Sequence, residues 1–218
     1  MKSIRLKAVR LITICLSIFI SVILFSCGRN YTSWEENKLA HGIEFEKIRY
    51  GIKDNDTTAI IGYLKANTTI EQYPCAADWA HFSKDWKLKL FRLSSKATVN
   101  NFEYCENSWI RFIQDGSVIC VFPENTIVQG FKCRGGGGAS GVSTSFYKSG
   151  RLNYFFSDGD VLVGDILCKS NLFNNIGLHE NGKLKECTLA EDKQINNVSY
   201  KKNTRICFDE TGNVKTIL

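Results

Sequence analysis

The chain has few of the features that mark several common classes of protein. Its 218 residues include only two prolines and three histidines, and no two cysteines are spaced as Cys-x-x-Cys. The missing Cys-x-x-Cys pair excludes the usual zinc-ribbon and thioredoxin-like arrangements. No long apolar stripe with the 3.6-residue period of a helix follows residue 55, whereas Val, Ile, Phe, Tyr, Thr and Asn are frequent. The composition therefore favours strands joined by turns.

Residues 27–218 also lack a large excess of either positive or negative charge. Four of the 28 basic residues lie in the first 26 positions, so the rest of the chain carries 24 basic and 22 acidic residues. This near balance gives no support to nucleic-acid binding, which requires a basic surface. The remaining 192 residues suit one domain with a sizeable core.

The sequence does not match common catalytic motifs, because each of them lacks a required residue or the required spacing. The run Gly135–Gly141 lacks the Gly-Lys-Ser/Thr of a phosphate-binding loop, and Val142 stands where a nucleophile elbow around Ser140 needs glycine. His81 is followed by Ser83 and Asp85 along a single strand, so these two side chains cannot take both sides of the imidazole. We therefore predict no catalytic residue, no metal and no other cofactor, and we interpret the glycine run as a flexible loop between strands.

The N-terminus carries the most informative positive signal. A basic start, Lys2 to Arg10, is followed by 15 uncharged residues, Leu11 to Phe25, and this run ends within Leu24-Phe25-Ser26-Cys27. This pattern resembles the lipobox of bacterial lipoprotein signal peptides, with an aliphatic residue three before the cysteine and a small one directly before it. An uncleaved transmembrane anchor would need about 20 apolar residues.

The resemblance implies a particular maturation and location. Residues 1–26 would be a signal peptide that is removed, and Cys27 would carry the lipid, including palmitate, with residues 27–45 as lipidated cysteine and tether. Membrane lipid would be the first partner. The protein would then be anchored to the cell membrane or the outer membrane, facing the periplasm or the exterior.

Internal repetition is the second clear signal. Turn-like pairs recur through the chain, and the second residues of successive pairs are 30, 34, 32 and 30 positions apart. Apolar residues lie at matching places before and after each pair, which is typical of a β-hairpin. The pairs are Asp85-Trp86, Asp115-Gly116, Ser149-Gly150, Asn181-Gly182 and Thr211-Gly212, and the apolar residues that follow them are Leu88, Val118, Leu152, Leu184 and Val214.

Each copy continues into a further apolar strand, so a copy supplies roughly three short strands and no helix. One such unit cannot bury its apolar face alone, so neighbouring units must share a core. We count five copies in a β-repeat domain over residues 46–218. The expected fold is all-β: an elongated array of about five 30-residue β-hairpin repeats, either a β-solenoid or a twisted meander.

The hairpins resemble membrane-occupation-and-recognition-nexus repeats and related bacterial lipoprotein repeats, whose units also pair Asn-Gly turns with aromatic strand positions. The resemblance covers residues 46–218. The present units are longer than those of that family and lack a regular second glycine, so no function is carried over from it.

Cysteines share one register of the repeat, with tyrosine in the last copy. A phenol is a poor replacement for a thiolate ligand, so we expect a ladder of small, buried, reduced side chains on neighbouring strands. Cys207, between Ile206 and Phe208, is expected on the face opposite the core. The residues of the register are Cys75, Cys105, Cys133, Cys168 and Tyr200.

Three functions remain open at this point. The first is a non-enzymatic envelope scaffold or binding module for an envelope protein or glycan, with Trp86 and Trp109 as a possible binding surface. The second is an envelope hydrolase with a site near His81 or the glycine run, favoured if His81, Cys75 and an acidic side chain share a concave pocket. The third is a structural protein joined to others through Cys207.

Overall fold

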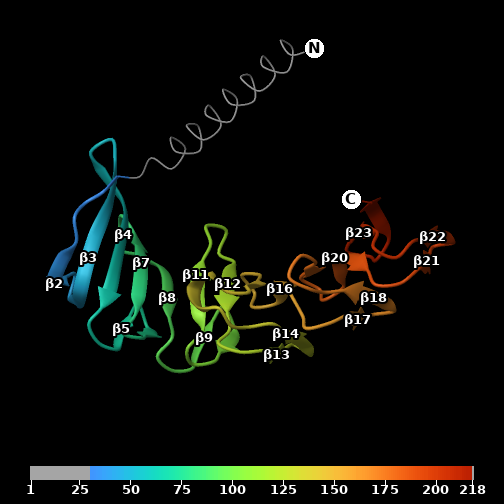
Figure 1. Ribbon diagram of the computed structural model, residues 1–218, viewed down its shortest axis with the longest axis horizontal. Helices are drawn as coiled ribbons and strands as arrows, with labels where there is room; N and C mark the ends of the chain where they lie inside the picture. The colour runs from blue at the N-terminus through green and yellow to red at the C-terminus, as the bar shows by residue number, and fades with distance from the viewer. Residues whose placement is uncertain (1–29, 218) are drawn as a thin grey trace, which may run out of the picture.

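The computed structural model describes residues 30–217 and shows an all-β protein built on one long antiparallel sheet. Figure 1 shows an elongated, twisted meander that runs from the first strands at one end to the last strands at the other. The proposed signal segment and Cys27 lie outside the described residues. The strands of this main sheet are β1 (Asn30–Tyr31), β2 (Glu35–Ala40), β3 (Ile43–Lys53), β4 (Asp56–Leu64), β7 (Trp79–Ser83), β8 (Leu88–Arg92), β11 (Trp109–Phe112), β12 (Val118–Val121), β15 (Thr144–Phe146), β16 (Leu152–Phe155), β19 (Ile176–Leu178), β20 (Leu184–Leu189), β23 (Arg205–Phe208) and β24 (Val214–Ile217).

Five short hairpins, the small hairpins, alternate with the hairpins of the main sheet. Each is closed by two residues, and in four of them both turn residues have positive φ, as at Asn100 and Asn101. This geometry matches the right-handed twist of the strands on either side. Only the fourth small hairpin joins the main sheet by pairing of its strands, between β18 and β20, and β17 and β18 thus complete the 16 strands of that sheet. The small hairpins are β5 (Thr68–Ile70) with β6 (Tyr73–Cys75), β9 (Ala97–Val99) with β10 (Phe102–Tyr104), β13 (Thr126–Val128) with β14 (Phe131–Cys133), β17 (Val161–Val163) with β18 (Ile166–Lys169), and β21 (Lys193–Ile195) with β22 (Val198–Tyr200).

The array therefore has five units, each a small hairpin followed by a main hairpin, after an opening hairpin β3–β4. The turns of the five main hairpins share one geometry. In the third, the Tyr147 N–H donates to the Arg151 carbonyl, and the N–H of Gly150, at φ +83°, donates to the Tyr147 carbonyl. The same bonds and a positive φ recur at Trp86, Gly116, Gly182 and Gly212. The predicted elongated repeat array is confirmed, and it takes the form of a twisted meander.

Four of the five main hairpins contain a β-bulge that the sequence analysis did not anticipate. In the first, His81 pairs with Leu90 and Phe82 pairs with Leu88, so Lys89 is left between them. A bulge changes which face the following residues occupy. The simple alternation of apolar residues therefore shifts by one position partway along the second strand. The bulged residues of the four hairpins are Lys89, Asn153, Lys185 and Lys215.

The hydrophobic core lies between the main sheet and the small hairpins. Buried residues of both contribute to a single cluster, and Figure 1 shows the first four small hairpins along one side of the sheet. At its centre, the ring of Phe146 lies 4.7 Å from that of Phe102 and 5.1 Å from that of Tyr104, measured between centroids. Of the residues predicted to point inward, four are buried and the one in the last strand is half-buried: Leu88, Val118, Leu152, Leu184 and, in the last strand, Val214.

The sheet begins inside the segment 27–45 that was predicted to be a tether. Strands β1 and β2 both pair with β3, so the sheet already begins at Asn30 and the predicted domain start at residue 46 falls inside β3. Strand β2 covers part of the first edge of the sheet by pairing with β3. Within residues 30–217, no helix has the length and apolar character needed to cross a membrane.

The predicted cysteine register is wrong in one unit. Tyr104 lies opposite Ala97 just as Cys75 lies opposite Thr68, so Tyr104 holds this position in the second unit and Cys105 lies one residue beyond it. Tyrosine thus fills the register in two of the five units. The predicted ladder is also wrong, because the small hairpins are mostly separate two-stranded sheets rather than neighbouring strands.

The remaining cysteines of the register behave as core residues. Cys75, Cys133 and Cys168 are fully buried. Burial raises the pKa of the Cys75 and Cys133 thiols to about 12, which keeps both protonated at neutral pH. Cys207 lies on the face opposite the core, as expected, and burial together with the nearby carboxylate of Glu186 raises its pKa. A protonated thiol is a weak nucleophile.

Candidate functional site

The main sheet has one face covered by the small hairpins and a second, outer face. Residues paired directly across antiparallel strands point to the same side. Pairing from β3 to β24 defines a continuous row on the outer face, one residue per strand. The row is Arg49, Ile61, His81, Leu90, Arg111, Ile119, Ser145, Tyr154, Gly177, Glu186, Cys207 and Thr216.

The two ends of this row differ in charge. Its first half holds Arg49, His81 and Arg111 and no carboxylate, and within the described residues neither arginine is in an ion pair. Burial lowers the pKa of His81, and the positive charges of the two arginines lower it further. In the second half, Glu186 is paired with Arg205 at 3.2 Å. The first half of the outer face therefore presents positive charge that no acidic side chain in the described chain offsets.

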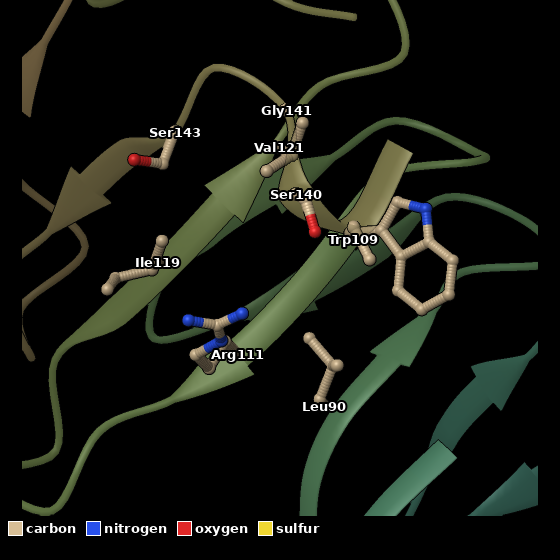
Figure 2. Close-up of a pocket in the computed structure, with 9 residues that line it drawn as sticks. Leu90, Trp109, Arg111, Ile119, Val121, Ser140, Gly141 and Ser143 are labelled. Atoms are coloured by element: carbon tan, nitrogen blue, oxygen red, sulfur yellow. The ribbon is translucent and has the colours of Figure 1, made fainter. Parts of the chain in front are cut away.

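The glycine run builds a pocket on this face. It folds into a 3-10 turn (η1, Gly138–Ser140), and Ala139 packs against an apolar cluster formed by Leu90, Trp109 and Val121. The cavity beside the turn has a volume of about 190 Å³. Figure 2 shows the Arg111 guanidinium and the Ser140 hydroxyl at this cavity. Its lining is Leu90, Trp109, Arg111, Ile119, Val121, Ala139, Ser140, Gly141 and Ser143.

The turn requires glycine for two separate reasons, which the prediction of a flexible loop did not foresee. Gly136, Gly137 and Gly138 all have positive φ, a conformation that other residues rarely adopt. At Gly135 and Gly141 the backbone lies so close to other carbonyl oxygens that a Cβ would clash with them. The glycines thus allow a tight fold against the sheet rather than a projecting loop.

The two tryptophans predicted as a binding surface lie in different environments. Trp109 lines the pocket and is 9% exposed. Trp86 occupies the main-turn position at φ +61°, where the other four units have glycine, and its indole stacks on His41 at 4.3 Å. That ring also contacts the edge of the core near Phe82. The structure does not bring the two indoles together.

The arrangement that would favour a hydrolase is likewise not assembled. His81 points to the outer face, whereas Cys75 is buried in the core on the other side of the sheet. In the described part of the chain, no three His, Cys, Asp or Glu side chains are grouped as metal ligands would be. Ser140 and Ser143 line the pocket, but within the described hydrogen bonds neither accepts or donates to a histidine.

A second feature of the outer face lies at its first edge. We call Tyr31, Trp34, Lys47, Arg49, Tyr63 and Trp79 the anchor-side patch. The Arg49 guanidinium carbon lies 4.3 Å from the ring centroids of both Tyr31 and Trp34, and the Lys47 ammonium lies 5.2 Å from that of Trp79. Trp79 also contacts Trp34, at 5.5 Å, and Tyr63, at 5.4 Å.

The sequence analysis missed this patch because it assigned residues 27–45 to a lipidated cysteine and tether. Two signals were available. Lys47 and Arg49 alternate along a strand and so share a face, and Trp34 is the one tryptophan outside the repeat.

Searches of protein-family models, of curated proteins and of solved structures find no match to this chain.

Proposed function

We propose that this protein is a lipid-anchored, non-enzymatic component of the cell envelope whose β-repeat array binds a negatively charged envelope component, a glycan or a protein segment, on its outer face. The anchor rests on the lipobox-like segment that ends at Cys27. The binding role rests on the outer face and its pocket.

The observation that carries the binding role is Arg111 at the mouth of the pocket. Its side chain is exposed, it lines the cavity with Trp109 and two serines, and it has no acidic partner in the described chain. A guanidinium with free donors fits carboxylate or phosphate groups, while the aromatic and apolar lining fits the non-polar part of the same ligand.

A pull-down from envelope extract tests this role. Arg111→Gln keeps a polar but shorter side chain and removes its charge, so we expect it to weaken capture of the main partner about tenfold or more. Arg151→Gln, an exposed arginine next to a main turn, is the matched control and should capture as the unaltered protein does. Equal capture by all three proteins would contradict the assignment of the pocket.

Labelling with fatty acid tests the anchor. Cys27→Ala removes the only sulfur on which the proposed lipid attachment could form at this signal, so it is expected to leave an uncleaved precursor that incorporates no labelled fatty acid. Two or more acyl chains would hold the unaltered protein at the membrane, since each buried CH₂ contributes about 0.8 kcal/mol. Processing and labelling that persist in the variant would refute the anchor.

A further inference from the structure

We infer that the anchor-side patch rests on the headgroup region of the membrane that carries the lipid anchor, so that the outer face of the first strands lies against the bilayer. This inference relies on the proposed lipid at Cys27 and adds an orientation and a second membrane contact to it.

The first argument is reach. Tyr31 is four residues from Cys27 and is already paired in the sheet, opposite Gly51 of β3. Four residues span at most about 14 Å even when fully extended. A lipid on Cys27 therefore holds the edge of the sheet close to the membrane surface, with no long tether to move it away.

The second argument is the chemistry of the patch. Tyrosine and tryptophan concentrate where a protein meets lipid headgroups, because their rings are apolar and one end of each can hydrogen-bond. Tyr31 is 38% exposed and Trp34 is 37% exposed. Tyr63 and Trp79 extend the aromatic surface along β4 and β7, paired directly with each other.

The third argument is charge. Lys47 and Arg49 lie among these rings, and within residues 30–217 neither is in an ion pair. The Arg49 Nε is buried and has no hydrogen-bond partner there. Lys and Arg side chains near an anionic leaflet are attracted to it. Lipid phosphates would supply the negative charge that no carboxylate of the described residues places beside these two cations.

The local packing fixes the orientation of the patch. A Cβ at Gly51 would lie 3.3 Å from the Tyr31 ring, so glycine at this position leaves room for the ring. Arg49 is held between Tyr31 and Trp34. Aromatic rings and cations therefore face outward together as one rigid surface rather than as separate flexible side chains.

The test uses the full-length protein, expressed and lipidated, then reconstituted into vesicles. Some vesicles contain phosphatidylcholine alone and others equal parts of phosphatidylcholine and phosphatidylglycerol, each with brominated acyl chains that quench nearby tryptophans. We expect tryptophan quenching in the anionic vesicles. Trp34→Phe should lose most of it, whereas Trp109→Phe, which alters the pocket further along the same face, should keep it.

Charge is tested separately with Lys47→Gln, alone and combined with Arg49→Gln, with circular dichroism to verify folding. We expect progressively less quenching in anionic vesicles and no change in vesicles of phosphatidylcholine alone. Quenching that survives Trp34→Phe unchanged, or its absence from a folded and vesicle-bound protein, would overturn the inference.

Flotation of the protein with vesicles distinguishes failure of this inference from failure of the proposed function. A protein that floats with vesicles but shows no quenching is anchored with its patch away from the membrane, which contradicts only the present inference. A protein that carries no lipid and does not float contradicts the proposed anchor itself.

Discussion

Replacing Gly150 with alanine is expected to lower the free energy of unfolding by about 2–5 kcal/mol, from two costs that add. Gly150 has φ +83°, so an alanine there must adopt a left-handed conformation. It is also buried between units, where a new Cβ would clash with the backbone carbonyl oxygen of Asn100 in the neighbouring small hairpin turn. Backbone cannot rotate away as a side chain can, so one of the two units has to shift.

Gly182→Ala separates the two costs. Gly182 occupies the same turn position in the next unit at φ +85°, but a Cβ there would meet nothing within 4 Å. It should cost only the conformational part, about 1–2 kcal/mol. Midpoints of denaturant unfolding, followed by circular dichroism, give both values. Equal losses at the two positions would show that the contact with Asn100 does not determine the stability of the array.

Replacing Leu152 with alanine is expected to cost about 2–5 kcal/mol, through lost burial and the cavity left behind. Leu152 is 1% exposed, begins β16 and pairs with Phe146 at the aromatic centre of the core. Its backbone N–H donates to the Gln129 side chain, and the substitution does not remove this donor. The loss therefore reports side-chain packing.

Arg151→Ala is the control for this prediction. Arg151 is the residue before Leu152, but its side chain is exposed. An exposed substitution of this kind is expected to change stability by about 0.5 kcal/mol or less. A small loss for Leu152→Ala, comparable with that of Arg151→Ala, would contradict the assignment of the inward face.

The repeat could be predicted because its turns produce a recurring pattern of residues in the sequence. The αL position of each main turn selects glycine, and the flanking alternation marks the strands, so Gly116, Gly150, Gly182 and Gly212 set the period correctly. Trp86 stands in place of this glycine in the first unit, yet the 30-residue spacing still identified the turn. The indole at this position stacks on His41, in the turn between β2 and β3, and this contact lies outside the repeat.

The predictions of which residues face inward were wrong where the alignment of the repeat units depends on backbone geometry. Tyr104 and Cys105 are adjacent, and only strand pairing shows which of them faces inward. The bulges have the same effect, since a single unpaired residue such as Lys89 moves Leu90 to the outer face. That shift brings Leu90 beside Arg111, so the pocket could not be assembled from an uninterrupted alternation.

The glycine run shows a second limit of prediction from sequence. Its composition indicated freedom of the backbone, but the direction of the loop is set by where Ala139 finds apolar surface, next to Trp109 and Val121. These residues are distant from it in the repeat pattern. Composition predicted that a loop exists there, and tertiary packing decided that it closes over the sheet.

The bulge in the last hairpin has a consequence for the protein in concentrated solution. Strand β24 pairs only with β23 among the described strands, so its far side presents unpaired backbone groups to which another molecule could add a strand. Lys215 sits at the bulge and is exposed, which distorts this edge and places a charge on it. Natural sheets use both devices against edge-to-edge aggregation. Within the described residues, the open meander thus ends in a strand whose edge discourages pairing with a second molecule.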